Sequence, residues 1–308
     1  MAIVTNRHNA PRSLVAVAEA PHYDSEGSDY TVTQLIDSPR VRILRKQHAD
    51  EIEVDPYESI FMLVGTAIHS IAEDHTIEDT TEERIHLSVD GGAVDVSGAI
   101  DLYYENEDGT YTIGDYKFTS IHSLRFPQKW EDQLGMYAFL FENGTVPGVT
   151  KPTVGKLEVY AILRDWSWRQ SKNDREYPQT PGVTVQIPLR SENERSAFFF
   201  RRLATHRLAD QLHRAGTIVR CTPEEMWQKE ETFAVRSRKR DDAATKRAGK
   251  SRAIRVLNSE EQAEAYIDEA DNDDYYVESR PGERTRCMSF CDVAKFCDQW
   301  KAFESGEG

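Results

Sequence analysis

Gly98-Ala-Ile-Asp101, followed after a short turn by Gly114-Asp115-Tyr116-Lys117, is the stretch of the chain that says most about its architecture. Aromatic and β-branched residues surround both parts, and the cluster Asn106-Glu-Asp-Gly109 between them is typical of a turn, so a β-hairpin is predicted. Folding this hairpin places Asp101 opposite Asp115, within one residue of register. Like charges directly opposite each other destabilise a pair of strands, so the two carboxylates need a compensating cation.

Lys117 is the nearest candidate for that cation. It follows Asp115 by two residues, and because side chains in a strand repeat with period 2, the two point to the same face. Two carboxylates and one ammonium group in one place suit a divalent metal ion together with an anionic substrate.

The rest of the chain predicts a mixed α/β core around this hairpin. Apolar spacing predicts the helices, and runs of branched and aromatic residues predict the strands. The expected elements are a helix over 31–48 that is interrupted at Pro39, a helix over 57–75, strands over 84–89, 99–104 and 111–118, a helix over 130–142, strands near 156–163 and 183–188, and a helix over 190–215. Helix, three strands, helix and strand in this order form an αβββαβ core.

Three regions are expected along the chain. Residues 1–30 have no apolar periodicity and are expected to form an extended arm. The core with its helical additions is expected over 31–218. Beyond Cys221 the chain becomes charged and irregular, so a smaller module is expected over 219–308, with a flexible loop over 238–251.

Composition limits the classes of function. The 308 residues are 39% hydrophobic and 30% charged, which is typical of a globular protein. The net charge of −15 argues against a protein that coats nucleic acid indiscriminately. However, residues 195–256 hold 16 Lys or Arg against 7 Asp or Glu, which predicts either one phosphate-facing surface or a solvated helix face with a basic loop.

No apolar run is long enough for a membrane span or a signal sequence. The expected location is therefore the cytoplasm.

Two helices carry polar pairs that share one helical face. His69 and Glu73 are spaced i, i+4 on the helix before the hairpin, and Gln133 and Tyr137 have the same spacing on the helix after it. Each pair alone is common, but their order around the two acidic strands is informative because the separate signals agree.

At this point the sequence resembles a known family. The motifs Gly65-Thr-Ala-Ile-His69, Gly98-x-x-Asp101, Asp115-Tyr-Lys117 and Gln133-x-x-x-Tyr137 are similar to the ordered motifs of PD-(D/E)XK nucleases. The most similar branch is the RecB type, with the CRISPR-adaptation nucleases and related phage exonucleases. The resemblance covers about residues 55–145 and implies a restriction-endonuclease-like core. The second acid is Asp115 where much of the superfamily has Glu, although Asp-Tyr-Lys is usual in the RecB-type branch.

The resemblance also implies a metal site. His69, Asp101 and Asp115 would hold Mg²⁺ or Mn²⁺, and the carbonyl group of Tyr116 would be a further oxygen ligand. Glu73 would be an additional ligand or would support one. Carboxylate oxygens suit Mg²⁺, and an added imidazole shifts the preference toward Mn²⁺.

The remaining motif residues would act on the substrate. In the resembled family's scheme, Lys117 orients or activates the attacking water and steadies charge on the phosphate. Gln133 and Tyr137 would position the strand that is cut.

Four cysteines form a second candidate site. Cys221 stands apart, and Cys287, Cys291 and Cys297 follow the pattern C-x3-C-x5-C. Such a set predicts either a 4Fe–4S cluster or structural Zn²⁺, with buried inert thiols as the third reading. RecB-type nucleases commonly carry an iron–sulfur cluster in a similar place, although there the first gap is usually two residues and the remote cysteine precedes the nuclease motifs.

The leading hypothesis is a metal-dependent DNA nuclease, an exonuclease or end-processing enzyme of recombination, repair or phage replication. Its partner would be DNA, at ends or in single strands, together with a recombination or repair protein and no membrane. Two alternatives stay open. One is a nuclease-like adaptor that binds DNA ends without cutting, and the other is an endonuclease that processes foreign DNA.

Overall fold

The computed structural model describes residues 3–20, 27–74, 80–150, 152–245 and 251–306, and within these the side chains of 72–74, 80–82 and 243–245 are not described. The chain divides into two compact units, residues 1–219 and 220–308. The division falls one residue from the predicted boundary between the core and the cysteine module. Each unit is considered separately below.

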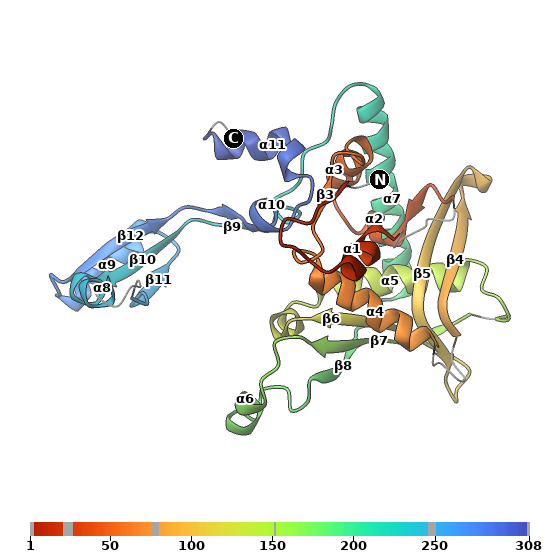
Figure 1. The fold of residues 1–308 in the computed structure, drawn as a ribbon, viewed down its shortest axis with the longest axis horizontal. Coiled ribbons are helices and arrows are strands. Elements are labelled where there is room, and N and C mark those ends of the chain that lie inside the picture. The colour runs from red at the N-terminus through yellow and green to blue at the C-terminus, as the bar shows by residue number, and fades with distance from the viewer. Residues whose placement is uncertain (1–2, 21–26, 75–79, 151, 246–250, 307–308) are drawn as a thin grey trace. The chain divides into compact units, whose positions relative to one another are not determined.

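The first unit is built on a six-stranded mixed sheet (Figure 1). Its neighbouring strands are, in spatial order, β2 (Tyr30–Thr31), β5 (Val94–Glu105), β6 (Tyr111–Thr119), β7 (Val154–Leu163) and β8 (Gly182–Ile187), with β4 (Thr80–Val89) also paired to β5. The pairs β2–β5 and β6–β7 are parallel, and the pairs β4–β5, β5–β6 and β7–β8 are antiparallel. The sheet is therefore mixed, as predicted.

Helices lie before, between and after these strands. They are α1 (Arg12–Glu19), α2 (Val32–Leu35), α3 (Pro39–Gln47), α4 (Ile60–Asp74), α5 (Gln128–Asn143), α6 (Trp168–Asn173) and α7 (Glu192–Arg214), with 3-10 turns at Asp90–Gly92 and Ile121–Arg125. The order α4, β4, β5, β6, α5, β7 is the predicted αβββαβ order, and the mixed α/β class is confirmed. Pro39 opens α3, where its missing N–H costs no hydrogen bond, which explains the predicted interruption.

The core of the first unit forms around α5. Every residue of α5 from Gln133 to Phe141 is buried, and the helix packs on the sheet and on α7. The ring of Phe139 of α5 packs at a tilt against that of Phe199 of α7, with ring centroids 4.6 Å apart. Burial of such aromatic side chains holds α5 firmly, since removing one from a core costs about 3–5 kcal/mol.

The expectation of an extended arm over residues 1–30 is wrong for its described part. Residues 12–19 form α1, and β1 (Ile3–Val4) pairs in parallel with β3 (Glu53–Val54). The buried carboxylate of Asp55 holds the residues after β1, because it accepts hydrogen bonds from the hydroxyl of Thr5 and the backbone N–H of Arg7. Local polar contacts of this kind leave no periodic apolar signal in the sequence.

The second unit contains a small sheet that the sequence does not predict. Strands β11 (Arg255–Leu257), β10 (Thr232–Ser237) and β12 (Tyr275–Arg280) pair in this order, all antiparallel, and α9 (Glu260–Ala270) packs on them. The rest of the unit holds β9 (Gln228–Lys229) paired with β13 (Glu283–Arg284), then α10 (Thr285–Ser289), a 3-10 turn at Ala294–Phe296 and α11 (Asp298–Glu304).

The predicted flexible loop over 238–251 is wrong in its first half. Residues 238–245 form the helix α8, and 246–250 lie outside the described residues. Asp241 in this helix binds the guanidinium group of Arg236 through two hydrogen bonds, so a buried ion pair orders a segment that reads as purely charged.

None of the helices among the described residues combines the length and the apolar character that a membrane crossing requires.

A buried polar network joins α3, α7 and β2 in the first unit. His206 has no exposed surface; its Nδ1 accepts a hydrogen bond of 3.0 Å from Arg42 Nε, and its Nε2 lies 3.2 Å from the carbonyl oxygen of Asp37. Arg42 also pairs with Asp210, which accepts a second hydrogen bond from the hydroxyl of Tyr30. Because Nδ1 is an acceptor here, the imidazole fits this network only in its neutral form.

This network predicts that acid destabilises the first unit. Burial lowers the pKa of His206 to about 4, and the charges of Arg42 and Arg202 add to the fall. Protons therefore bind more tightly in the unfolded state, so stability is complete above about pH 6.5 and is lost as the pH falls toward 4, by up to about 3 kcal/mol. Hydrogen exchange of α3 and α7 between pH 4 and pH 7.5 should report this loss.

His206→Gln keeps one donor and one acceptor but cannot titrate. In this variant the protection of α3 and α7 from hydrogen exchange should therefore fall less on acidification. His213→Gln, at the end of the same helix, is the matched control and should behave as the unchanged protein. An equal acid sensitivity in all three would contradict the assignment.

Candidate active site

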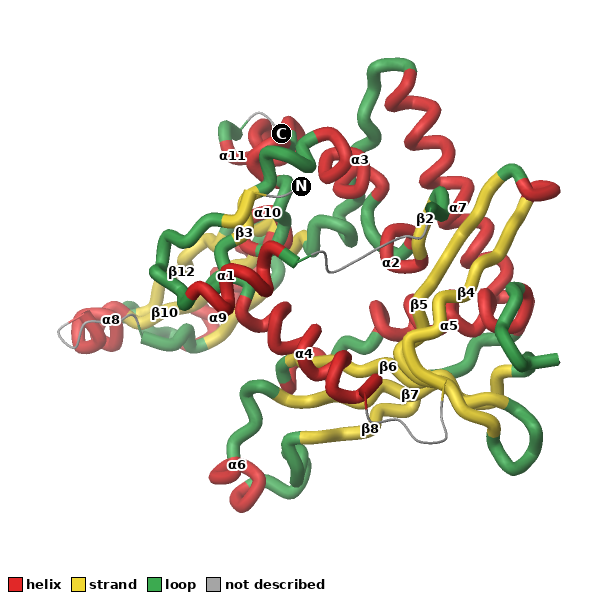
Figure 2. The backbone as a smooth tube through the Cα atoms, turned by 45° about the vertical axis from the view of Figure 1, so that its right-hand side comes forward, coloured by secondary structure: helices red, strands yellow, loops and turns green. Residues whose placement is uncertain are grey.

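The candidate site lies where β5 and β6 separate. Their pairing runs from Glu105 with Tyr111 to Leu102 with Gly114 and goes no further. Beyond that point β5 continues with β4 and β6 continues with β7, and Figure 2 shows the two pairs of strands running apart. Asp101 and Asp115 are the next residues along the two strands, which is the register that the hairpin predicts.

The separation of the strands leaves the backbone of Tyr116 without its partner on β5. Two side chains replace that partner. The N–H of Tyr116 donates to Asp101 Oδ2 at 2.9 Å, and its carbonyl oxygen lies 3.1 Å from Nε2 of His69. Nδ1 of His69 in turn lies 3.4 Å from the same Asp101 oxygen. The histidine on α4 and the carboxylate on β5 are thus both fixed by one residue of β6.

The contact between His69 and Asp101 also affects the charge of the imidazole. The hydrogen bond to Asp101 raises the pKa of His69, and partial burial acts in the opposite direction. His69 and Asp101 therefore form a charge-assisted pair beside the backbone of Tyr116.

The second carboxylate belongs to a separate group of side chains. Asp115 is 1% exposed, and its Oδ2 lies 2.5 Å from Nζ of Lys117, which is 26% exposed. Its Oδ1 accepts a hydrogen bond of 3.2 Å from Nε2 of Gln133, and the same nitrogen lies 3.1 Å from the hydroxyl oxygen of Tyr137. Apart from Lys117, Oδ2 has no hydrogen-bond partner in the part of the chain that the structure describes.

Burial raises the pKa of Asp115 above the usual range of a carboxyl group, and the nearby charge of Asp101 adds to the rise. Lys117 acts in the opposite direction. A carboxylate in this position is costly to keep charged without a cation, so Asp115 and Lys117 depend on each other.

Gly98 explains how Tyr137 reaches this group. A Cβ atom at Gly98 would lie 2.9 Å from Cε1 of Tyr137 and 2.9 Å from Cγ2 of Val32. The bare backbone of β5 therefore lets the ring of Tyr137 lie directly against the strand. The glycine of the Gly98-x-x-Asp101 motif is a packing requirement of α5.

Gly98→Ala should destabilise the first unit by about 1–3 kcal/mol, because the added methyl group meets a ring and a branched side chain in a packed core. Gly65→Ala is the matched control in the neighbouring motif. Its Cβ would meet only Cβ of Phe118, at 3.9 Å, and alanine is favoured inside a helix, so stability should stay the same or rise by up to about 1 kcal/mol. Urea unfolding of both variants measures the difference, and equal stabilities would contradict the packing role.

The structure thus brings the predicted residues together as two groups. His69, Asp101 and the backbone of Tyr116 form one group, and the side chains of Asp115, Lys117, Gln133 and Tyr137 form the other. Glu73 lies in α4, but its side chain falls outside the described residues.

The donor types suit Mg²⁺ or Mn²⁺, since two carboxylates, an imidazole and a carbonyl oxygen are present. Their arrangement, however, is not that of a finished ligand sphere. Among the described side chains, no group of three or more His, Cys, Asp or Glu is close enough to hold a metal ion. Metal binding here would require His69 to release one ring nitrogen from its present partner and to lose the proton there, and Asp101 and Asp115 to turn toward a common point.

Tyr160 is a neighbour of the site that the sequence does not single out. Its ring lies 5.5 Å from that of Tyr116 and covers Gly114, where a Cβ would lie 2.6 Å from its Cε2. Its hydroxyl group donates to Glu158 at 2.6 Å, and burial raises the pKa of Tyr160. The contact follows from the parallel pairing of β6 with β7, which a single sequence does not specify.

The cysteines all lie in the second unit, and none forms a disulfide. Burial raises the pKa of Cys287, and the thiols of Cys291 and Cys297 contribute to the rise, so these three lie near one another. Gln299 binds Cys221 through both backbone groups, with distances of 2.7 Å to its N–H and 3.0 Å to its carbonyl oxygen. The remote cysteine is therefore tied to a residue two positions after Cys297.

Comparisons with known proteins add little to this description. No family model matches the chain, and no curated protein matches it. The solved structure described as "Crystal structure of SSO0001" resembles the chain with a TM-score of 0.39 and 16% sequence identity, over 63% of this chain and 82% of that one. A likeness at this level carries no argument about fold or function.

Proposed function

We propose that the chain is a metal-dependent nuclease that hydrolyses phosphodiester bonds of DNA. The observation that supports this most is the pair of acidic groups at the separation of β5 and β6. Each carboxylate there is held by other polar groups, and together they face a histidine, a lysine and a backbone carbonyl. A sheet that needed only stability would not gather two acids at one point.

The metal ligands in this proposal are His69, Asp101, Asp115 and the carbonyl oxygen of Tyr116. A bound Mg²⁺ or Mn²⁺ would supply a Lewis acid for the phosphate and a nucleophile at neutral pH. The protein's own part is to hold these donors in place. Tyr116 does so by binding Asp101 with its N–H and His69 with its carbonyl oxygen.

Lys117 is the residue that contacts the substrate in this proposal. Its ammonium group is anchored on a buried carboxylate and its side chain is partly exposed, so in this proposal it binds a phosphate oxygen without leaving its partner. Such a fixed cation stabilises the charge that grows on the phosphate during the reaction. It also orients a water molecule toward the phosphorus.

Gln133 and Tyr137 position the second group. Gln133 fixes Oδ1 of Asp115 from α5, and the hydroxyl group of Tyr137 fixes the amide of Gln133. This leaves Oδ2 of Asp115 directed at Lys117. Loss of either α5 side chain would therefore disturb the acid and, through it, the lysine.

Asp115→Asn and Lys117→Gln should each lower the rate of DNA hydrolysis by about a hundredfold or more, because each removes a charge that the reaction needs. The rate is measured on labelled single- and double-stranded DNA, linear and circular, with Mg²⁺ and with Mn²⁺. The control variants are Glu107→Gln, which removes an exposed negative charge, and Lys156→Gln, which removes an exposed positive charge. Both should keep the full rate.

Hydrolysis at the full rate in Asp115→Asn or Lys117→Gln would contradict the mechanism. Cleavage of circular DNA would favour the endonuclease. Tight binding of DNA ends with no hydrolysis in either metal would favour the adaptor, an alternative that the net charge of −15 and the incomplete ligand sphere among the described side chains keep open.

We infer further that Cys221, Cys287, Cys291 and Cys297 hold a 4Fe–4S cluster, with structural Zn²⁺ as the alternative. The inference is supported by four free thiols in one small unit, two of which, Cys291 and Cys297, lie close enough to Cys287 to raise its pKa. Among the described residues these thiols do not yet surround a common point, so binding of the cluster would draw them together. In that role the cysteines would join the two ends of the second unit and add to its stability.

Protein purified without oxygen should be brown, with broad absorbance from sulfur-to-iron charge transfer and about four iron atoms per chain. Cys291→Ser and Cys221→Ser should lose the colour and the iron. Ser289→Ala changes an exposed neighbour and should keep both. Colourless protein that contains zinc would favour the alternative, and protein with neither metal would contradict the site.

A further inference from the structure

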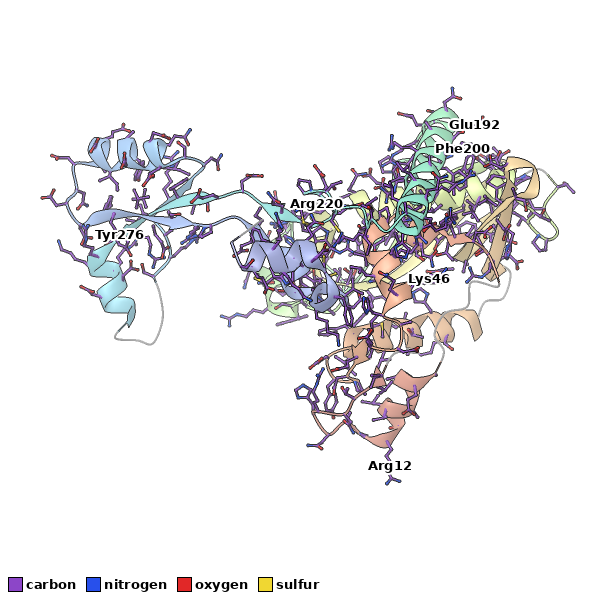
Figure 3. All side chains as sticks on the ribbon, turned by 90° about the horizontal axis from the view of Figure 1, so that it is seen from above. Arg12, Lys46, Glu192, Phe200, Arg220 and Tyr276 are labelled. Carbon is purple, nitrogen blue, oxygen red and sulfur yellow. The ribbon has the colours of Figure 1, made fainter. Side chains whose placement is uncertain are left out.

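The second unit separates its charges to an unusual degree. Residues 238–255 hold eight Lys or Arg against two Asp, while residues 259–274 hold eight Asp or Glu and no Lys or Arg. The basic segment includes α8, and the acidic segment includes α9. Figure 3 shows these two helices apart, with the strands of the small sheet between them.

The basic residues of α8 are not explained by the stability of the helix. Cations near the N-terminus of a helix oppose its dipole and are unfavourable. The protein compensates with Asp274, whose carboxylate accepts hydrogen bonds from the N–H of Lys239 at 3.0 Å and from the hydroxyl of Ser237. The hydroxyl of Ser237 in turn accepts from the N–H of Arg240 at 3.1 Å. The cap makes the helix possible in spite of its cations.

A buried ion pair holds the basic segment in shape. Arg236 is 4% exposed and binds Asp241, Glu278 and the carbonyl oxygen of Ser251. Asp241 also accepts from the hydroxyls of Ser251 and Tyr276. Since Asp241 and Ser251 meet at one guanidinium group, the chain that leaves α8 returns beside it. Asp241 is thus paired with Arg236, and Asp242 is the exposed acid of the segment.

Among the described cations of this segment, Arg255 lies over the ring of Tyr266, and three others are directed to solvent without such a contact. Lys239, Arg240 and Arg252 are exposed and form no ion pair within the described residues. Arg238, by contrast, lies over the ring of Tyr276 and donates to two carbonyl groups, so it belongs to the fold. The first turn of α8 and the returning chain thus present positive charge to solvent on a rigid base.

We propose that Lys239, Arg240 and Arg252 bind the phosphate backbone of DNA. The choice of DNA as the polyanion rests on the proposed nuclease function. Without the net six positive charges of 238–255 the chain would carry −21, and a body of that charge repels DNA. A cationic surface on the second unit would offset this repulsion and hold the substrate through residues other than those that cut it. Contacts to phosphate carry no sequence information, so binding would be general.

The test is the affinity of the full chain for a labelled duplex with a single-stranded overhang, measured in EDTA over a range of salt concentrations. The triple variant Lys239→Gln, Arg240→Gln, Arg252→Gln should bind about tenfold more weakly or worse at low salt. The slope of log affinity against log salt should shrink by about 0.9 for each phosphate that the variant no longer neutralises.

The matched control is Lys156→Gln, Lys172→Gln, Arg175→Gln, which removes the same charge from exposed positions of the first unit. It should keep the salt slope of the unchanged protein. Circular dichroism and the melting temperature show whether the triple variant folds. If the triple variant does not fold, the single variant Arg240→Gln provides the same test with about a third of the effect.

An affinity and slope equal to those of the control would overturn the proposal. The result is independent of cleavage, because binding is measured without metal. A chain that cuts DNA but binds it equally in both variants contradicts this surface alone. A chain that never cuts DNA but binds it more weakly in the triple variant contradicts the nuclease function alone.

Discussion

The backbone of Tyr116 is the point on which the candidate site depends. Where β5 and β6 separate, its N–H and carbonyl groups lose the partners that a continuous ladder would give them. A buried backbone group without a partner is costly, and here a carboxylate and an imidazole replace the missing strand. Asp101 and His69 thus replace the missing strand partners and are also the candidate metal ligands. The same hydrogen bonds that close the sheet hold the two side chains beside the candidate site, and a metal ion would have to replace some of them.

The group around Asp115 depends on the balance of its charges. Asp115 is buried by α5, and its charge is kept by Lys117 and by the amide of Gln133. Removing one member of such a group leaves an uncompensated charge, which costs more than removing the whole group. Gly98 adds a steric condition, since the ring of Tyr137 can reach this group only across a bare stretch of β5.

Local relations in the chain are predictable from sequence, and distant ones are not. The hairpin register of Asp101 and Asp115, the shared face of Asp115 and Lys117, and that of Gln133 and Tyr137 all follow from short spacings. The parallel neighbours β7 of β6 and β2 of β5 come from far along the chain, so nothing in the sequence points to Tyr160. The helix α8 escapes prediction because the polar contacts of Arg236 hold a segment that reads as purely charged.

The short pairing of β9 with β13 has a consequence for how the chain can evolve. Lys229 and Glu283 are direct neighbours across two strands, so the small sheet, α8 and α9 leave the rest of the second unit and return to it at one point. A segment whose ends already touch can be gained or lost with little change in the entropy of the remaining chain. The long interval between Cys221 and Cys287 is therefore a detour in sequence, and a relative without it could keep the same four thiols on a much shorter polypeptide.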